Sequence, residues 1–450
     1  MRLGCVKDRG GLARLAVPLP CLVPALLAGC TRGGMNAKRE ATNGTDAAPA
    51  AVEAVARPTS DLGVFSAPIG ATRVGGLNVV AGLVAAEGIV RVMALVQGTV
   101  VWSADALRGV TWTADAELRL QPAASGVAVF WRGMHEGRVS RTLVLLGPRG
   151  EPRGDPVEIG GTFCGTADGL AWIGTRAAGR ARVRARRWAD LESRDVLTLP
   201  PDRDPTLVCG DHDVVVLGDG DDDLTASTFI PGDTAARSPA ALMRNVDFGD
   251  DEREHDAFSI GDDLGLVRIG TSGAVALREV PRGGAPGPWR KLKHSLSTDD
   301  DVVTVDGDAT GIVIVVTHDA DDACAEGGAA AESVRALRVD RKTGEESIVP
   351  LASADCDRSR GPFWIASAPS GSLVAWVERR TAQSPKAAPV AGLSFRVFRA
   401  DGVLAGRIEQ PADAIADSGC DDEGCSVAAL IREPGADGTR PAPIRVFAYP

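Results

Sequence analysis

The sequence predicts an all-β fold, and three observations support that prediction. Short apolar runs alternate with turn residues throughout the region 61–450, the same arrangement recurs along its whole length, and no strong amphipathic helix pattern interrupts it. Apolar residues at every second position are typical of strands that are buried on one side. The lack of helical patterns argues against folds built from alternating strands and helices.

The stretch from residue 121 to residue 159 shows one repeating unit. A first apolar run precedes Ser125-Gly126, and Val127, Val129 and Trp131 then alternate along a second strand. We expect a polar loop over 133–140, a third strand over 141–146 and a fourth over 156–159, with the GPRG sequence at 147–150 as a turn. Glycine supplies positive φ angles and proline presets the first turn position. Four strands joined by hairpins match one blade of a β-propeller.

Eight such units follow one another, about 40 to 60 residues apart, which brackets the repeat lengths of propellers. Each has a tight turn before a second strand, and glycine stands at seven of the eight equivalent turn ends, where a left-handed residue is expected. The second strands are predicted to start at Gly88, Gly126, Gly169, Asp213, Gly265, Gly311, Gly371 and Gly424.

Third and fourth strands are predicted after most of these second strands. Their residue ranges are 181–187 with 195–199, 274–280 with 288–292, 334–339 with 347–351, and 393–398 with 403–408. The eighth unit offers a first strand near 414–420, a second from Cys425 and a third over 443–449, so it lacks a fourth strand. The segment Leu62 to Ile69 (LGVFSAPI) has no unit of its own. We therefore predict that this N-terminal strand is the outer strand of the last blade and closes the ring.

Eight four-stranded blades are the predicted architecture, and seven are the alternative. Seven would result if the first unit were irregular, because Leu77 to Val84 and Val100 to Ala104 have the weakest turn signals.

Composition limits the classes of ligand. The 450 residues include 8 Trp, 10 Phe and one Tyr, and the formal net charge is −11. Surfaces that bind carbohydrate or nucleic acid usually stack their ligands on aromatic side chains, and nucleic-acid binding also requires positive charge. We therefore expect no nucleic-acid partner.

Residues 1–29 are predicted to be a lipoprotein signal peptide. Arg2, Lys7, Arg9 and Arg14 form a positive region before the apolar stretch 15–27, which is too short to span a bilayer comfortably. The sequence Leu27-Ala28-Gly29-Cys30 resembles the lipobox of bacterial lipoproteins, which implies lipidation of Cys30. The alternative is an ordinary cleaved signal peptide with a chance cysteine. In lipoproteins an Asp after the cysteine favours the inner membrane, so Thr31 implies the outer membrane, facing the periplasm or the cell surface.

Residues 30–60 are predicted to be a disordered tether, because residues 31–60 contain no Leu, Ile or Phe and cannot bury enough apolar surface to become ordered. The remainder, 61–450, is the predicted propeller domain. Since the chain is acidic, the lipid and not charge is expected to hold it at an anionic membrane.

Six cysteines remain after those of the signal peptide and Cys30 are set aside, and an even number in an oxidising compartment favours disulfides. Cys164 and Cys209 occupy similar places in the first strands of two consecutive units and are predicted to pair. Cys420 and Cys425 flank a four-residue turn, and Cys324 and Cys356 form the third predicted pair. A metal site is the alternative, but there is no CxxC motif and Cys209 with His212 has no second ligand pair.

No motif indicates a catalytic, cofactor or metal site. Asp219, Asp221 and Asp223 have the spacing of a calcium loop, but Leu224 and Ile230 stand where such a loop needs Gly and Glu. These and the other acidic clusters are interpreted as solvated loop tips, and the basic run 180–187 as a solvated blade face. The five histidines are His135, His212, His255, His294 and His318, and no two have metal-ligand spacing.

The region 61–450 resembles bacterial periplasmic propellers of the broad TolB- and WD40-like type, on its repeat architecture alone. The resemblance favours a non-enzymatic, lipid-anchored binding or scaffold protein with a protein partner in the cell envelope, since propellers present variable loops on a rigid disc. The alternative is a propeller hydrolase or lyase with a site at the central channel, which requires carboxylates, histidines or a metal from several blades to converge there.

Overall fold

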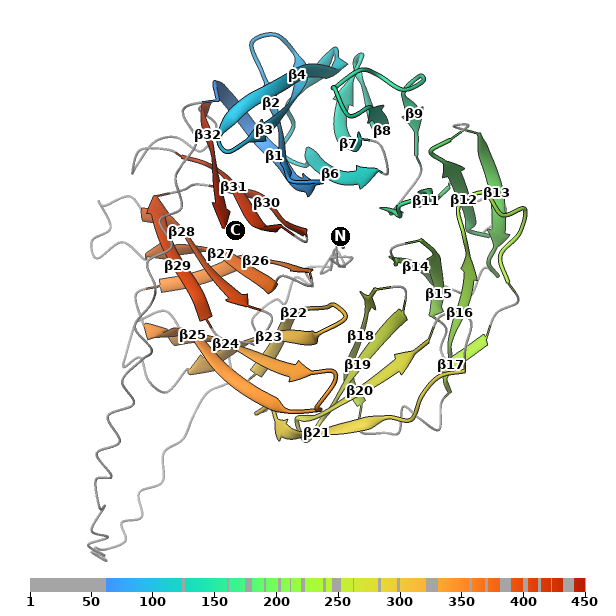
Figure 1. Ribbon diagram of the computed structural model, residues 1–450, viewed down its shortest axis with the longest axis vertical. Helices are drawn as coiled ribbons and strands as arrows, with labels where there is room; N and C mark the ends of the chain where they lie inside the picture. The colour runs from blue at the N-terminus through green and yellow to red at the C-terminus, as the bar shows by residue number, and fades with distance from the viewer. Residues whose placement is uncertain are drawn as a thin grey trace, which may run out of the picture.

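The computed structural model describes residues 62–449, with gaps at 124–125, 160–161, 175–179, 190–191, 201–203, 211, 220–222, 238–239, 245–251, 262, 282–284, 298–299, 321–330, 356–357, 369–370, 381–389, 400–403, 412–413, 422 and 432–440. Some strand segments are described by their backbone alone. The described residues form strands β1 to β32 and include no helix that could span a membrane. The protein is an all-β propeller, and Figure 1 shows its strands arranged around a central axis.

Pairing arranges the described strands in six sheets, because β1 also pairs with β32 and β18 also pairs with β22. For description we number the strands as eight consecutive groups, in which groups 8 and 1 share one sheet and groups 5 and 6 share another. Groups 1 to 4 contain the following strands: β1 (Val64–Val74), β2 (Leu77–Val84), β3 (Ile89–Val96), β4 (Thr99–Arg108); β5 (Val110–Thr111), β6 (Glu117–Ala123), β7 (Gly126–His135), β8 (Arg138–Leu146), β9 (Val157–Glu158); β10 (Phe163–Gly165), β11 (Gly169–Ile173), β12 (Arg182–Arg187), β13 (Ser193–Thr198); β14 (Asp204–Cys209), β15 (Val214–Asp219), β16 (Asp223–Phe229), β17 (Ala240–Arg244).

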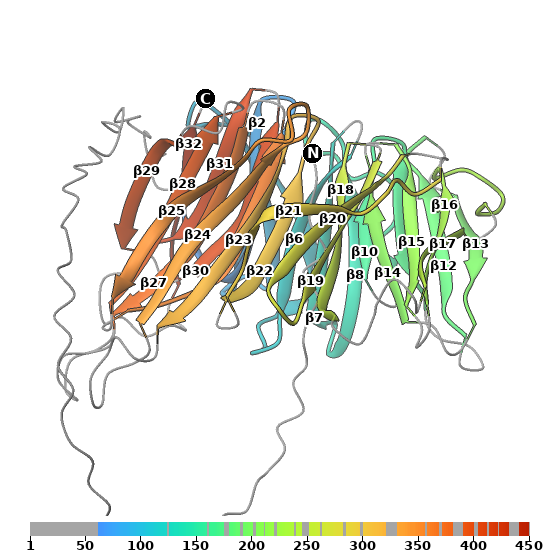
Figure 2. The same ribbon diagram turned by 90° about the horizontal axis from the view of Figure 1, so that it is seen from below.

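Groups 5 to 8 complete the described chain: β18 (Glu252–Ile260), β19 (Asp263–Gly270), β20 (Ala274–Val280), β21 (Arg290–Ser295); β22 (Asp300–Gly307), β23 (Gly311–Ala320), β24 (Ala331–Asp340), β25 (Glu346–Asp355); β26 (Arg358–Ala368), β27 (Gly371–Arg380), β28 (Val390–Arg399), β29 (Leu404–Pro411); β30 (Ala414–Asp421), β31 (Gly424–Leu430), β32 (Ala442–Tyr449). Viewed from the side, the groups stand next to one another as a disc (Figure 2).

The innermost strand of each group lies next to the axis and contacts its counterparts in the neighbouring groups. It is the first strand of its group, except in group 2, where it is β6, which follows the two-residue strand β5. These contacts run from β1 through β6, β10, β14, β18, β22, β26 and β30 and return from β30 to β1. Hydrophobic clusters fill the spaces between neighbouring groups. Because every described group buries apolar side chains on both of its faces, each one is held by its two neighbours.

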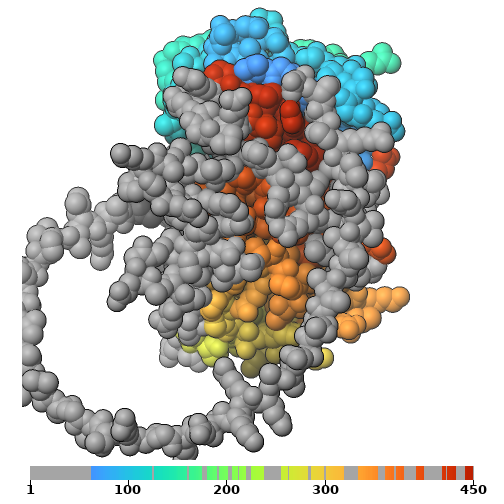
Figure 3. Space-filling view, turned by 90° about the vertical axis from the view of Figure 1, so that its left-hand side faces the viewer, coloured from blue at the N-terminus to red at the C-terminus, as the bar shows by residue number. Residues whose placement is uncertain are grey.

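Strand β1 has two partners, which differs from the prediction. Val64 and Phe65 pair with Pro443 and Ala442 of β32, as expected of an outer strand of the last group. From Ser66 onward the same strand pairs with β2, so it is also the first strand of group 1. The register shifts between Ser66 and Ile69, around Pro68, which has no N–H to donate. Assigning Leu62 to Ile69 wholly to the last blade was therefore wrong. Figure 3 shows this blue segment against the red last group.

Because β1 also belongs to group 1, the strand predicted to start at Gly88 is not the second strand of its group. It is β3, the third strand of group 1 and not the second, because β1 supplies the first strand and β2 the second. The other seven predicted second strands correspond to β7, β11, β15, β19, β23, β27 and β31. The predicted loop 133–140 was also wrong: β7 continues to His135 and β8 begins at Arg138, which leaves a turn of Glu136 and Gly137.

Glycine at the predicted turn ends has two different causes. Gly88 has a φ of +62°, which is the left-handed conformation expected there. Gly169 lacks a positive φ, but a Cβ at this position would lie 2.3 Å from the carbonyl oxygen of Arg186. Close approach of the second and third strands therefore requires this glycine.

Candidate functional site

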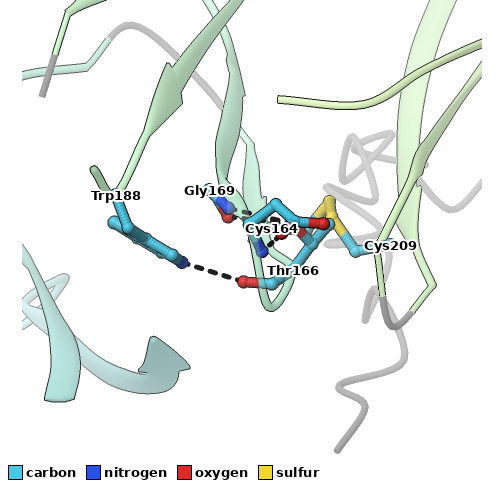
Figure 4. The surroundings of a disulfide bond; sticks show 6 residues. Cys164, Thr166, Gly169, Trp188 and Cys209 are labelled. Carbon is cyan, nitrogen blue, oxygen red and sulfur yellow. Dashed lines mark hydrogen bonds between the residues drawn. A yellow bond between two sulfur atoms is a disulfide. The ribbon is translucent and has the colours of Figure 1, made fainter. Parts of the chain in front are cut away.

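Groups 3 and 4 are joined near the axis by a disulfide between Cys164 of β10 and Cys209 of β14 (Figure 4). Thr166 holds the adjoining turn, since its Oγ1 accepts a hydrogen bond from the Gly169 N–H at 3.1 Å. The indole N–H of Trp188 donates to the Thr166 carbonyl oxygen at 2.9 Å (Figure 4). The disulfide joins groups 3 and 4, and the two hydrogen bonds hold the turn between β10 and β11 in place.

Next to this disulfide, His212 and Asp168 connect the corresponding turns of the two groups. The Nδ1 atom of His212 lies 2.8 Å from Oδ2 of Asp168, and both side chains are about half exposed. The pair spans the same boundary as Cys164–Cys209 and so ties the same two groups.

Cys420 and Cys425 also form a disulfide, across the hairpin of β30 and β31, where they are direct cross-strand neighbours. Cys30, Cys324, Cys356, the signal peptide and the tether lie outside the described residues. The same holds for Asp221 and for the side chains of Asp219 and Asp223, so the structure does not describe the possible calcium loop.

His318 belongs to a polar cluster around Asp300, which is fully buried. Oδ1 of Asp300 lies 2.9 Å from Nδ1 of His318, and Arg335 donates to Oδ2. The Oγ atom of Ser297 lies 3.3 Å from the same Nδ1. A Ser-His-Asp relay requires the serine on Nε2 and the carboxylate on Nδ1, so this cluster lacks the geometry of such a relay. Asp300 instead anchors the start of β22.

Of the remaining described histidines, one lies in group 2 and two lie in group 5, on different strands. His135 ends β7, His255 lies in β18, and His294 in β21 contacts Glu346 of β25. Within the described ranges, no three His, Cys, Asp or Glu side chains come together in a way that could hold a metal ion.

A cleft of about 570 Å³ opens between groups 2 and 3. Its walls include Glu158 and Ile159 from group 2 and Trp172, Arg182, Arg184 and Asp195 from group 3. Pockets for small ligands or side chains typically measure about 300–1,000 Å³. A second cavity, between groups 5 and 6, measures about 230 Å³ and falls below that range. The larger cleft is therefore the candidate binding site.

The cleft exists because the outer strand of group 2 is short. β9 contains only Val157 and Glu158, whereas the outer strand β13 of group 3 has six residues. Among the described residues, group 2 consequently leaves the side chains of Arg182 and Arg184 on β12 partly exposed. Along β12, Val183 and Ala185 point into the core shared with group 4, so alternation places Arg182 and Arg184 on the opposite side, toward group 2.

Asp195 holds both arginines in place. Its Oδ2 lies 3.3 Å from Nη1 of Arg182, and its Oδ1 lies 2.9 Å from Nε of Arg184. The second contact is an ion pair without good hydrogen-bond alignment, since this buried Nε has no partner with hydrogen-bond geometry. The Arg184 guanidinium also lies over the Trp172 ring, 5.6 Å from its centroid, which favours a cation–π interaction.

Alternation also places Arg186 on the group 2 side of β12, but of this strand only Arg182 and Arg184 line the cleft. Burial lowers the pKa of Arg186, and the negative charge of Asp155 in group 2 partly opposes this effect. The negative charge of Asp155 thus favours the charged form of Arg186.

The sequence interpretation of residues 180–187 as a solvated blade face missed the cleft. The available signal was the sequence Arg-Val-Arg-Ala-Arg, in which every second residue is basic although the third strand lies between two blades. A third strand with apolar residues on one side and arginines on the other indicates a neighbour that does not cover it.

No protein-family model matches the chain, and no curated protein matches it. Solved structures do resemble it. The WD40 domain of SCAP from fission yeast is 11% identical, with 87% of this chain and 98% of that chain covered and a TM-score of 0.45. The β-propeller domain of the trilobed protease from Pyrococcus furiosus is 12% identical, with 74% and 95% covered and a TM-score of 0.43.

TolB from Acinetobacter baumannii is 10% identical, with 66% of this chain and 79% of that chain covered and a TM-score of 0.32. At these identities the likenesses concern the fold alone. The solved structures that resemble the chain thus include TolB and a WD40 domain, as expected, and both are β-propellers.

Proposed function

We propose that this protein is a lipid-anchored β-propeller of the bacterial cell envelope that binds a partner protein. The observation that carries the proposal is the cleft between groups 2 and 3, which is open and lined by fixed charged side chains. Disulfide and ionic contacts tie group 3 to group 4, so the wall formed by group 3 is preorganised. A preorganised site loses less conformational entropy when a partner binds.

The envelope location is supported by the lipobox-like sequence before Cys30 and by Thr31 after it. The two disulfides fit an oxidising compartment. Cys30→Ala should release the protein from membranes, because the tether has no apolar anchor of its own. Cys21→Ala is the matched control, since that cysteine leaves with the signal peptide. Membrane association of the Cys30→Ala variant, measured by fractionation, would contradict lipidation.

Eight blades closed by the N-terminal strand are part of the same proposal. The pairing of Val64 and Phe65 with β32, and the contacts of β30 with β1, support closure. Deleting residues 61–70 should lower the free energy of unfolding by several kcal/mol, because it removes a paired strand and its buried face. Deleting 31–55 should change it little. Equal melting of both truncated proteins would contradict closure.

Photocrosslinking in intact cells tests the binding function directly. A photoreactive residue at position 158, at the mouth of the cleft, should give a discrete adduct with an envelope protein. The control is the same residue at position 187, whose native arginine packs against Gly232 on the other side of β12. Absence of an adduct at 158, or an identical adduct at 187, would contradict partner binding in the cleft.

A further inference from the structure

We infer that the cleft between groups 2 and 3 binds an extended acidic segment of the partner, with carboxylates at alternate residues. The inference rests on the proposed binding function and specifies the chemistry of its ligand. The observation that supports it is the pair formed by Arg182 and Arg184, at alternate positions of β12, in the wall of the cleft.

The spacing of the pair selects an extended peptide. Alternate residues of a strand lie about 6.6 Å apart and point to the same side. A partner segment in an extended conformation has the same repeat, so its acidic side chains at every second position fall opposite successive arginines. In a helix, acidic residues at alternate positions point in different directions and lack this match.

The guanidinium groups have donors for a second carboxylate. Each carries five N–H groups in a planar fork. Asp195 contacts one nitrogen of Arg182 and one of Arg184, and it also fixes their positions. The contacts of Asp195 therefore show, within the protein itself, that a carboxylate binds to these two arginines. The Arg182 side chain is 51% exposed, so an incoming carboxylate reaches it without rearrangement of the core.

The positive charge of its arginines distinguishes the cleft from the rest of the surface of this acidic protein. The chain as a whole has a net charge of −11, so an acidic segment is repelled over most of the surface and attracted at the arginine pair. Glu158 on the opposite wall works against an acidic ligand and limits its affinity. Removing that charge is therefore expected to strengthen binding.

A single-stranded nucleic acid also carries regularly spaced anions, but the cleft fits it less well. Single strands are bound by stacking their bases on aromatic rings. Trp172 is only 1% exposed and the Arg184 guanidinium lies over it, so it offers no free ring face to a base. The acidic peptide is consequently the better match.

Fluorescence anisotropy with the purified full chain tests the inference. The probe is a fluorescein-labelled peptide in which glutamate alternates with threonine. Its controls are the same peptide with glutamine for glutamate, a peptide with the same glutamates placed consecutively, and a single-stranded oligonucleotide. Binding is measured with the wild-type protein and with Arg182→Gln, Arg184→Lys, Glu158→Gln and, as the matched control, Arg187→Gln.

We expect Arg182→Gln to weaken binding of the alternating peptide by about tenfold, because it removes a charge-assisted contact. Arg184→Lys should also weaken it, since lysine keeps the charge but lacks the fork. Glu158→Gln should tighten binding by about threefold through loss of repulsion. Arg187→Gln should leave it unchanged, and the consecutive and glutamine peptides should bind more weakly.

Equal weakening by Arg187→Gln, equal binding of the glutamine peptide, or tighter binding of the oligonucleotide would each overturn the inference. If the alternating peptide fails to bind while the adduct from position 158 forms in cells, the acidic ligand is wrong and the binding function stands. If the adduct is also absent, the proposed function fails with it.

Discussion

The Nε atom of Arg73 lies 2.6 Å from Oδ1 of Asp421, which joins the first strand of group 1 to the hairpin of group 8. Oδ2 of the same aspartate accepts a hydrogen bond from the Gly76 N–H at 3.0 Å. The two side chains are 8% and 14% exposed. No acceptor meets Nε with hydrogen-bond geometry, so the attraction between Arg73 and Asp421 is mainly that of an ion pair. The two ends of the described chain are therefore linked by charge as well as by strand pairing.

Arg73→Met should lower the free energy of unfolding by about 3 kcal/mol, because removal of one partner leaves a poorly solvated carboxylate without its counter-ion. Adding Asp421→Asn should restore part of the loss. Chemical denaturation of both variants measures these changes. As a control, Arg108→Gln should scarcely alter stability, since Arg108 is 75% exposed in its pair with Asp105. A loss in the control as large as that in Arg73→Met would refute the role of burial.

Phe65→Ala should destabilise the domain by about 3–5 kcal/mol, as expected for truncating a buried aromatic side chain. Phe65 is 2% exposed and belongs to the cluster between groups 8 and 1, which also contains Ile444. The neighbouring Val64 pairs with the same strand but is 60% exposed, so Val64→Ala should cost much less. Thermal unfolding of the two variants separates apolar burial from strand pairing; equal effects would contradict this account.

Gly419→Ala should lower stability by about 1–3 kcal/mol, the usual cost of overpacking. A Cβ at this position would lie 2.8 Å from the backbone N of Arg73, where β30 passes β1. The matched control is Gly174→Ala, whose added Cβ would have its nearest neighbour at 3.4 Å. Unfolding curves that show no difference between the two variants would argue against close packing of the inner strands.

The two disulfides should differ in their contributions. The Cys164–Cys209 bond spans a sequence separation of 45 and Cys420–Cys425 one of only 5. Loop-closure entropy then predicts losses of about 4 and about 2 kcal/mol when each pair is replaced by alanine. Denaturation of the two double variants measures this order, and a larger loss for Cys420→Ala/Cys425→Ala would contradict it.

Acid should weaken the contact between groups 5 and 6. Burial alone would raise the pKa of Glu346, but hydrogen bonds from the backbone and ring of His294 and from the Lys293 N–H outweigh it and hold the pKa below 4.5. A carboxylate with a lowered pKa in the folded state binds fewer protons there than in the unfolded chain. Its stabilising contribution is therefore full above about pH 4.5 and is lost as the pH falls through the folded pKa.

Glu346→Gln should remove this part of the acid dependence. Unfolding midpoints of both proteins between pH 6 and pH 3 measure the effect, with the difference between them shrinking toward low pH. A difference that stays constant across the range would exclude titration of Glu346 as its cause.

Much of the strand order was predictable because each hairpin carries a local signal. Turn glycines and alternating apolar residues located seven second strands, and the similar positions of Cys164 and Cys209 in first strands indicated that they are neighbours. The error at Gly88 arose because β1 serves two groups at once, which depends on contacts with β32 at the other end of the sequence. Local patterns contain no information about such a pairing.

The cleft was not predictable for a related reason. The sequence led us to interpret Arg182 and Arg184 as solvated residues, because alternation shows only on which side of β12 they lie. Their surroundings depend on how far β9 of the neighbouring group extends, and Val157 and Glu158 belong to a segment whose apolar pattern suggested a longer strand. The end of that strand decides whether the arginines face solvent or line a cleft.

The pairing of Val64 and Phe65 with Pro443 and Ala442 also imposes an order in time. A ribosome makes Val64 and Phe65 long before it makes Pro443 and Ala442. Until then Phe65 has no strand to pair with and its apolar ring stays accessible, so the nascent chain is exposed to mispairing throughout synthesis. Burial of Phe65 is therefore completed only after Ala442 and Ile444 have been made.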